Sequence, residues 1–453
     1  LTQPTYMSKY PPAQGLALAF GQKLFGQPWI GVWLSVGLMC AAICWMLQGW
    51  IAPEWALLGA LMVVTRIGIL NYWMDSYWGG AIAATGGALV LGAVPRIARE
   101  LRVRHAVVFA SGLAVLMNSR PFEGFVLAAL ASAALIWWLW RERFGWRLVI
   151  PRVALPAIVV IVPVLAGMAY QNWRVTGNAL LLPYVAHDRQ YAAASLFLWN
   201  GPQTVPVYRH AALREYWADW QVGVIREARK DVAGQFFERL GGLYAFFFGL
   251  WPVLAVALIW PYSLKSREER WTAGILGAFL FVTVAPLGGV LPHYSAPIVA
   301  LLYLRLLHSF SRLPEWKVKG WPAGSALLAG LLVAWLGQFA LGLWMPAMVP
   351  QLAAERGQVI SKVKQVPGDH LILVRYVPGH SIHEEWVYNR ADIDGSPIVW
   401  AREMAGVADR ALLEHFSGRH IWLLTVGESP KLTAYPGEVA EQTVRPGVSE
   451  SVQ

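Results

Sequence analysis

Long apolar stretches, separated by short polar segments, run along the chain as far as residue 345. A helix needs roughly 20 mostly apolar residues to cross the hydrocarbon core of a bilayer. Stretches of about that length predict about ten membrane-spanning helices, at 28–48, 55–71, 79–95, 106–119, 122–140, 153–171, 240–260, 273–290, 294–309 and 322–345. The pattern therefore predicts a mainly α-helical fold, a polytopic transmembrane bundle.

The pattern changes after residue 345. Short apolar and β-branched runs predict three strands, at 371–376, 396–400 and 421–426. Residues 408–416 have helical periodicity, and alternation of strand and helix is typical of a small parallel sheet. We therefore predict a transmembrane domain over 1–345, with a long outer loop at 172–239, and a small soluble α/β domain over 346–453.

The composition agrees with lipid as the main solvent. Of the 453 residues, 57% are hydrophobic and only 14% are charged, whereas soluble domains carry roughly 25% charged residues. The 25 Trp residues fit the same interpretation, because Trp favours the interface between lipid and water. The net charge of +10 therefore does not indicate nucleic acid as a partner.

Basic residues gather in loops at every second turn of the chain, while the intervening turns at 72–78 and 290–293 have none. The basic loops contain Arg96, Arg99, Arg102 and Arg104, then Arg141, Arg143, Arg147 and Arg152, then Lys265, Arg267 and Arg270, and finally Arg305, Arg312, Lys317 and Lys319. Cytoplasmic loops are enriched in Lys and Arg. We therefore predict a multi-pass protein of the inner (plasma) membrane, whose C-terminal domain is extracytoplasmic.

The same pattern places the first residue, Leu1, outside the cytoplasm. The sequence does not begin with Met. We therefore expect one further helix upstream of Leu1, which would return the N-terminus to the cytoplasm.

Asp75 is a candidate catalytic residue in the short outer turn Asn71-Tyr72-Trp73-Met74-Asp75-Ser76-Tyr77-Trp78. A carboxylate in a turn surrounded by aromatic residues can bind a divalent cation or take a proton. The alternative is an ordinary turn aspartate within a belt of aromatic residues. Carboxylates usually bind metal in company, and no second acidic residue is near Asp75 in the sequence.

Lys9 is a candidate for binding a phosphate. It lies in Tyr6-Met7-Ser8-Lys9-Tyr10-Pro11-Pro12, where two prolines stiffen the chain. A lysine held at the membrane surface can neutralise a lipid phosphate as a point charge. The alternative is a lysine that only extends its ammonium from the membrane to water.

Four further residues at the outer ends of spans are candidate substrate ligands. Arg120 can bind a phosphate oxygen or can pair with Glu123 in the same turn. Arg66 can pair with Asp75 or with the same phosphate. His293 and the adjacent Tyr294 open the ninth span and can donate hydrogen bonds to a polar ligand, although as interfacial residues they need no ligand.

Taken together, these segments resemble the GT-C glycosyltransferases, which are integral membrane enzymes. The resemblance is to the branch that contains the lipid A aminoarabinose transferases and the protein O-mannosyltransferases, and it covers roughly residues 1–345. It rests on Lys9-Tyr10-Pro11-Pro12 followed by Gln14-Gly15-Leu16, on Asp75, and on Pro292-His293-Tyr294 with Pro297. In this family the corresponding lysine contacts the phosphate of the lipid carrier.

The resemblance implies transfer of a sugar from a polyprenyl-phosphate donor to an acceptor on the extracytoplasmic side of the cell envelope, with inversion at the anomeric carbon. Lys9 and Arg120 would stabilise the charge that grows on the departing phosphate. Asp75 would bind a divalent cation (Mg²⁺ or Mn²⁺) or orient the acceptor. The family's main catalytic acid follows its first transmembrane helix, so we expect that residue upstream of Leu1.

Two other classes of protein fit parts of the pattern. A transporter or flippase for lipids or sugars would also be polytopic, but such proteins often have repeated halves and polar sites near the midplane. The sequence has no evident internal repeat, and its polar residues gather at the outer face. A membrane scaffold with a partner-binding C-terminal domain is the third interpretation.

Overall fold

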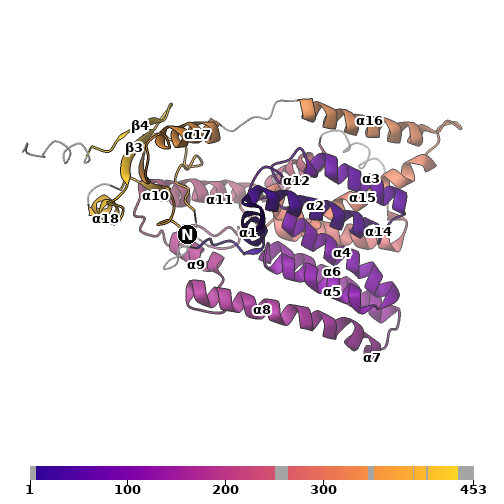
Figure 1. The fold of residues 1–453 in the computed structure, drawn as a ribbon. Helices are drawn as coiled ribbons and strands as arrows, with labels where there is room; N and C mark the ends of the chain where they lie inside the picture. The colour runs from indigo at the N-terminus through magenta and orange to yellow at the C-terminus, as the bar shows by residue number, and fades with distance from the viewer. Residues whose placement is uncertain are drawn as a thin grey trace, which may run out of the picture. The chain divides into compact units, whose positions relative to one another are not determined.

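The computed structural model describes residues 7–201, 203–249, 264–344, 351–390, 392–404 and 407–436 (Figure 1). Two compact units make up the chain. The first comprises Leu1–Pro206 and Trp220–Met345, and the second comprises Val207–Asp219 and Pro346–Gln453. Part of the predicted outer loop at 172–239 therefore belongs to the same unit as the C-terminal residues, which the sequence did not indicate.

The first unit is mainly helical over its described residues. Its α-helices are α1 (Ala13–Phe25), α2 (Pro28–Leu47), α3 (Pro53–Val63), α4 (Ala81–Glu100), α5 (Val103–Met117), α6 (Pro121–Arg141), α7 (Trp146–Val149), α8 (Leu155–Thr176), α9 (Pro183–Tyr191), α11 (Gln221–Lys230), α12 (Val232–Phe248), α14 (Arg267–Val284), α15 (Val299–Arg312) and α16 (Ala323–Trp344). The π-helical turn η1 (Val64–Gly68) extends α3, and η2 (Ile150–Ala154) joins α7 to α8. The 3₁₀ turns η5 (Pro292–Ile298) and η6 (Leu313–Glu315) flank α15.

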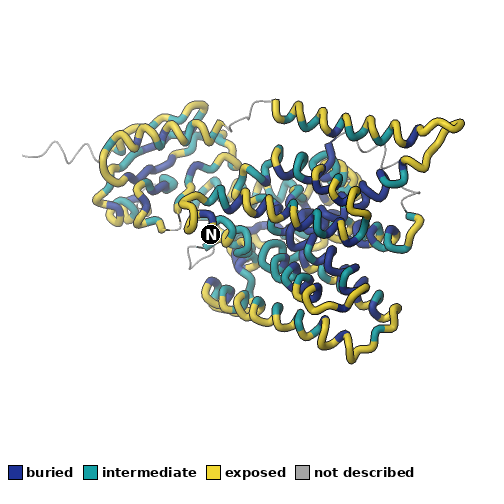
Figure 2. Tube along the Cα trace, turned by 45° about the vertical axis from the view of Figure 1, so that its right-hand side comes forward, coloured by how far each residue is buried: buried dark blue, intermediate teal, exposed yellow. Residues whose placement is uncertain are grey.

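A helix lies at each predicted span, although the span at 240–260 runs into residues outside the described part. Among the described residues, five helices are long and apolar enough to cross a membrane: α2, α4, α6, the continuous helix Trp146–Thr176, and α16. The apolar helix α5 is shorter. The membrane-embedded helical fold is therefore supported, while the number of about ten spans stays a prediction. α8 and α16 are largely exposed along their length, as surfaces that face lipid would be (Figure 2).

Helix α4 lies at the centre of the first unit, where it packs against α2, α5, α6, α15 and η5. Small residues let helix backbones approach closely. A Cβ atom on Gly87 would lie only 1.8 Å from the carbonyl oxygen of Pro297 in η5. One on Gly112 of α5 would lie 2.8 Å from the carbonyl oxygen of Gly86. These glycines therefore hold α5 and η5 directly against α4.

Helix ends that the charge pattern assigns to one side of the membrane lie together. We call this the basic-loop end, formed by the C-termini of α2, α4, α6 and α15 and the N-terminus of α14. Arg96 donates to the carbonyl of Trp45 at 2.7 Å, and Arg99 pairs with Glu268 at 3.4 Å. The contacts link α4 to both α2 and α14, which agrees with the predicted alternation of the chain.

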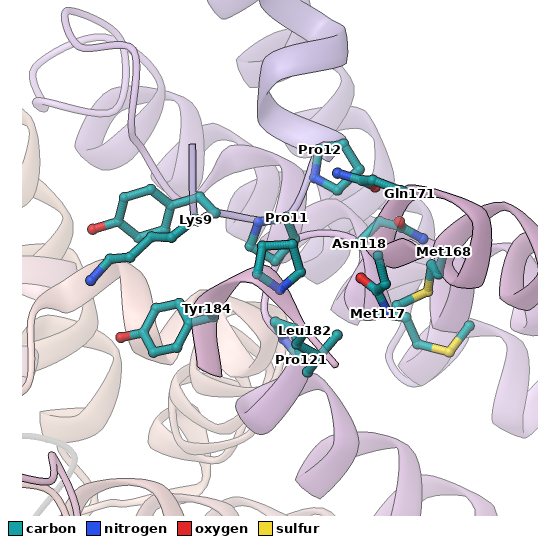
Figure 3. Close-up of a pocket in the computed structure, with 13 residues that line it drawn as sticks. Lys9, Pro11, Pro12, Met117, Asn118, Pro121, Met168, Gln171, Leu182 and Tyr184 are labelled. Carbon is teal, nitrogen blue, oxygen red and sulfur yellow. The ribbon is translucent and has the colours of Figure 1, made fainter. Parts of the chain in front are cut away.

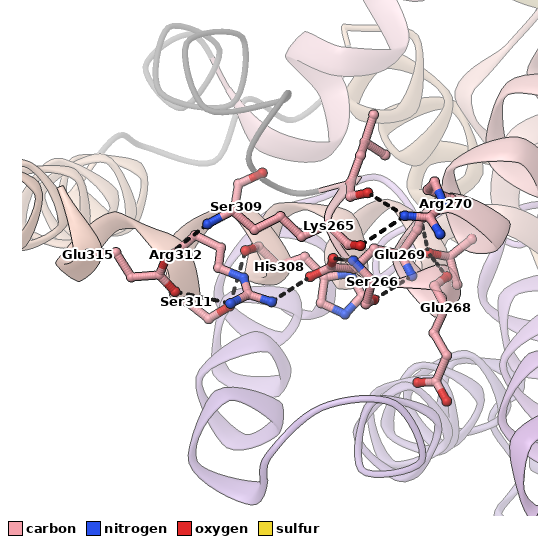
Figure 4. Close-up of polar contacts among 12 residues, drawn as sticks. Lys265, Ser266, Glu268, Glu269, Arg270, His308, Ser309, Ser311, Arg312 and Glu315 are labelled. Carbon is pink, nitrogen blue, oxygen red and sulfur yellow. Dashed lines mark hydrogen bonds and ion pairs between the residues drawn. The ribbon is translucent and has the colours of Figure 1, made fainter.

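Glu269 shows how this end accommodates a buried charge. Its carboxylate accepts a hydrogen bond from the backbone N–H of Ser266, and Ser266 in turn caps α14 (Figure 4). Arg312 at the end of α15 contributes an ion pair with Glu269 at 3.2 Å. Buried carboxylates require such partners, so this cluster joins the N-terminus of α14 to the C-terminus of α15.

The second unit contains a four-stranded sheet in the order β2-β1-β3-β4. Its strands are β1 (His370–Tyr376), β2 (Ile398–Arg402), β3 (His420–Val426) and β4 (Lys431–Ala434), and its helices are α10 (Ala211–Arg214), α17 (Gln351–Val363) and α18 (Val407–His415), with the π-helical turn η3 (Glu215–Trp220) after α10. β1 pairs in parallel with β2 and β3, whereas β4 is antiparallel to β3. The predicted parallel strands and helix are thus present. The short and mostly exposed β4 was missed.

Alternate residues of β1 face the two sides of the sheet. Ile372 and Val374 pack in a cluster with Val359 and Val363 of α17. Leu371 packs on the other side with Phe416, which directly follows α18. The sheet is therefore covered on both faces, as expected for central parallel strands.

The contact between α4 and η5 leads to a stability prediction. Gly87→Ala should lower the free energy of unfolding by about 1–3 kcal/mol. The added methyl group would clash with backbone atoms of Pro297, and no side-chain rotation can relieve that clash. Gly277→Ala in α14 is the matched control, since no atom lies within 4 Å of its added Cβ. Thermal unfolding in detergent measures both, and equal melting temperatures for the two variants would contradict the proposed packing.

Candidate functional site

Lys9 is held beside the connection between α5 and α6. Pro11 and Pro12 restrict the backbone that follows Lys9, and α1 begins immediately after them. The N–H of Ala13 donates to the carbonyl of Asn118 at 2.9 Å, which fastens the start of α1 to the end of α5. The proline pair and this hydrogen bond thus fix the chain that carries Lys9.

The Lys9 ammonium lies among two tyrosine rings and one carboxylate. Its Nζ is 4.7 Å from the ring centroid of Tyr184 and 5.5 Å from that of Tyr10. It is 3.8 Å from Oδ1 of Asp188 in α9, and the Lys9 side chain is only 14% exposed. Burial lowers the pKa of the Lys9 ammonium below its ordinary value of 10.5, and Asp188 opposes part of this shift.

The two tyrosines remain hydrogen-bond donors over the physiological pH range. Burial is the main cause that raises the pKa of both Tyr10 and Tyr184, and Asp188 adds to the increase. Arg120 opposes the shift in the pKa of Tyr10, so the charge of Arg120 lies within electrostatic reach of Tyr10. The site therefore presents one cation and two neutral phenols.

A small cavity of about 30 Å³ extends from Lys9 between α5 and α8. Its wall is mostly apolar and includes Met117, Met168 and Leu182. Lys9 and Tyr184 lie at one edge and Met168 at the other (Figure 3). The volume holds about one water molecule, so a larger ligand requires side chains to move apart.

Arg120 and Tyr294 meet next to this cavity. The Arg120 guanidinium lies over the Tyr294 ring, 4.5 Å from its centroid. Among the ion pairs of the described residues there is none between Arg120 and Glu123, although the Glu123 side chain is buried. The predicted alternative of an Arg120–Glu123 ion pair is therefore wrong, and Arg120 is left stacked on an aromatic ring.

His293 connects η5 to the short turn that contains Asp75. Its Nδ1 forms a hydrogen bond with the Tyr72 hydroxyl at 2.7 Å, and its ring lies 5.2 Å from that of Trp78. Burial lowers the pKa of His293 to about 3, so its imidazole is neutral at physiological pH. The short turn and the start of the ninth predicted span are therefore in direct contact.

Asp75 itself is exposed in the turn. Within the described parts of the chain, no three His, Cys, Asp or Glu side chains are grouped so that they could hold a metal ion. A catalytic or metal-binding role of Asp75 stays a prediction.

Arg66 has a different environment from the one expected. Its guanidinium donates to the carbonyl oxygens of Ala245 at 2.6 Å and Phe246 at 3.0 Å, near the C-terminal end of α12. The described residues include no ion pair between Arg66 and Asp75, so the predicted pairing is wrong. Two of the guanidinium's N–H groups are used inside the helical unit, which favours a structural role.

Sequence reasoning missed the residues that surround Lys9 and His293. Asp188 and Tyr184 come from α9 in the long loop, and Tyr72 comes from the aromatic turn. A weak signal was present at Asp188, a charged residue in a short helix opened by Pro183. It does not identify Lys9 as the partner, because the contact joins distant parts of the chain.

Comparisons with known proteins find a likeness in structure. A scan of protein-family models and a search of curated proteins find no match. ArnT from Cupriavidus metallidurans bound to undecaprenyl phosphate superposes with a TM-score of 0.51 and 11% identity, over 96% of this chain and 85% of that chain. The chain has the ArnT fold. The apo structure of ArnT gives a TM-score of 0.49 and 12% identity, over 97% of this chain and 85% of that chain.

The ArnT fold agrees with the predicted resemblance to GT-C glycosyltransferases. At 11% identity the likeness establishes the fold and does not transfer residue roles from ArnT. The roles of Lys9, Arg120, His293 and Tyr294 therefore depend on the geometry described above.

The environment of Arg66 predicts a loss of stability on conservative substitution. Arg66→Lys keeps the charge but cannot reach both carbonyls with one planar group, so we expect the free energy of unfolding to fall by about 1–3 kcal/mol. Thermal unfolding measures this. Arg120→Lys is the comparison. The Arg120 guanidinium only stacks on a ring, so this substitution should lower the free energy of unfolding by less, about 1 kcal/mol. An unchanged melting temperature for Arg66→Lys would contradict the structural role.

Proposed function

We propose that this protein is a membrane glycosyltransferase that takes a sugar from a polyprenyl-phosphate donor and transfers it to an acceptor hydroxyl at the membrane surface. The observation that carries the proposal is the Lys9 ammonium, held against the rings of Tyr10 and Tyr184 beside an apolar cavity. It is supported by the ArnT fold, since one ArnT structure is bound to undecaprenyl phosphate. A phosphate joined to a long hydrocarbon chain needs both a cation and an apolar path.

The proposed reaction is a displacement at the anomeric carbon. The acceptor oxygen forms a new bond to that carbon and loses its proton to a base, while the bond to the phosphate oxygen breaks and leaves polyprenyl phosphate. Negative charge grows on the departing phosphate. Preorganised donors aimed at such a charge commonly contribute a large part of catalysis. Lys9 would supply the cation, and the hydroxyls of Tyr10 and Tyr184 would donate hydrogen bonds.

Asp188 would act as the substitute for phosphate when the site is empty. It is the acidic partner of Lys9, at 3.8 Å, and its side chain is 37% exposed. A carrier phosphate would have to displace this carboxylate from the ammonium. Because a partly exposed ion pair contributes only about 0.2–1 kcal/mol, the exchange costs little.

Arg120 and His293 would bind the other end of the donor. Arg120 lies over the ring of Tyr294, and its stacked guanidinium keeps N–H groups for a phosphate oxygen. Neutral His293, oriented by Tyr72, can exchange hydrogen bonds with sugar or acceptor hydroxyl groups. Arg66 is the weakest member of the predicted set, since its guanidinium already bonds two carbonyls.

Asp75 would orient the acceptor or hold a divalent cation. One exposed carboxylate is compatible with Mg²⁺, which often keeps several waters and binds through one or two carboxylates together with substrate phosphates. The bound ion would supply further positive charge at the phosphate. The acceptor, the sugar and any ion remain parts of the proposal.

The central prediction concerns Lys9. Lys9→Ala in the full-length protein should reduce sugar transfer from a polyprenyl-phosphate donor by about 10²–10³-fold, as for loss of one preorganised charged donor. Its melting temperature should change little, since burial already disfavours the ammonium.

Asp188→Asn should tighten binding of undecaprenyl phosphate by up to about fivefold, because the competing carboxylate is removed.

Lys9→Arg is the control for charge. The folded-state pKa of Lys9 is lowered, so wild-type affinity should fall as pH rises through a range below 10.5, whereas the arginine variant should stay charged there. Near-normal turnover of Lys9→Ala would reject the phosphate role. Transport of a labelled lipid without glycosyl transfer would favour the transporter interpretation.

A second prediction tests Asp75. Asp75→Asn should lower turnover strongly and should remove the sensitivity of the wild-type reaction to a metal chelator. Glu54→Gln is a suitable control, since Glu54 is also an exposed acidic residue of the first unit, in the first turn of α3. A fully active Asp75→Asn variant, or wild-type transfer that no chelator affects, would reject the metal role.

A further inference from the structure

A second cavity lies at the basic-loop end, away from Lys9. Its volume is about 220 Å³, and it is formed by α4, the C-terminal part of α6, the N-terminal part of α14 and Trp50. Pro121 at the start of α6 lines the Lys9 cavity, whereas Trp137 and Trp138 near its end line this one. The rise of an α-helix places these positions about 24 Å apart. The cavity is therefore separate from the proposed transfer site.

Aromatic rings form much of its wall. The rings of Trp137 and Trp271 lie 4.6 Å apart, and Trp50 and Trp138 have a centroid separation of 6.3 Å. Apolar side chains of α4, including Leu91 and Val94, complete the interior. Tryptophan favours the level of the lipid headgroups, so the composition of this wall matches the boundary between hydrocarbon and water.

Two arginine side chains lie near Trp137 in the wall of the cavity. The Arg267 guanidinium is 4.1 Å from the Trp137 ring centroid, and Arg141 is 5.8 Å from the same centroid. Buried Nη2 of Arg267 has no hydrogen-bond partner among the described residues. A wider, open hollow of about 670 Å³ shares Trp137, Arg267 and Trp271 with the cavity and also includes Arg141 and Arg270.

The charged residues of the cavity and the adjoining hollow, counted with Arg99, leave a positive excess. Two glutamates line the cavity, Glu142 and Glu268, and Glu268 is already paired with Arg99 at 3.4 Å. Arg270 donates from Nη1 to the carbonyls of Leu264 and Lys265. The Arg267 guanidinium stacks on the Trp137 ring, which explains how its plane is oriented. This contact does not provide a hydrogen-bond acceptor for Nη2.

We propose that this cavity binds the headgroup of an anionic phospholipid. A phosphate oxygen would accept a hydrogen bond from Nη2 of Arg267, and Arg141 would add a second positive charge. The tryptophan rings would contact the glycerol and the first acyl carbons. Basic pockets between transmembrane helices are suited to anionic lipids, and the apolar wall distinguishes a lipid from a soluble anion. On the predicted orientation, this lipid comes from the cytoplasmic leaflet.

The experiment titrates short-chain phosphatidylglycerol into the detergent-purified full chain and follows binding by native mass spectrometry. Phosphatidylcholine should bind more weakly. Arg267→Gln and Arg141→Gln should each weaken phosphatidylglycerol binding about fivefold, as expected for loss of one basic group near a lipid phosphate. Arg267→Lys should lose less, because the charge remains.

Arg147→Gln is the matched control, since Arg147 is an exposed arginine of the same basic loop that does not line the cavity. Its affinity should be unchanged. Melting temperatures in lipid-free detergent separate a binding defect from a folding defect. Equal affinity for the two lipids, or an equal loss in Arg147→Gln, would overturn the proposal. Displacement of the lipid by inorganic phosphate at the same concentration would assign the site to a soluble anion instead.

Discussion

Close approach of helix backbones is the constraint on which the first unit depends. Helices in lipid gain little from burying apolar side chains against one another, because hydrocarbon is just as apolar. They associate where small residues allow many short contacts. Gly86 and Gly87 let α4 approach the backbone of α5 on one side and that of η5 on another. Since α5 leads to Arg120 and η5 carries His293, the packing of α4 also sets the separation of the proposed ligands.

Charged groups are then distributed to the two ends of the bundle, each with partners suited to it. At the basic-loop end, Glu269 has both a helix cap and Arg312, and Arg99 has Glu268. At the other end, Lys9 has two aromatic rings and a partly exposed carboxylate at 3.8 Å. At the basic-loop end, each of these charged groups therefore has a partner of opposite charge. The other end places a cation beside a carboxylate that is partly open to solvent.

The elements were more predictable than their contacts. Hydrophobic length and the alternation of basic loops located the helices, because both act along the chain. Strand positions in the second unit followed from their apolar and β-branched residues, while polar, exposed β4 gave no such signal. Lys9, Arg120 and His293 were chosen as candidate ligands from residue type and sidedness. Their partners Asp188 and Tyr72, and the use of Arg66 at α12, depend on tertiary contacts that no local pattern encodes.

The division of the second unit between two segments has a consequence for synthesis. Residues 207–219 leave the ribosome well before the strands with which they form a unit, and several helices of the first unit come between them. The unit is joined to the bundle by chain at three places instead of one. It cannot be completed until translation reaches the end of the sheet, after the helices of the first unit have been synthesised. A fragment beginning after α16 would lack α10 and would be an incomplete folding unit.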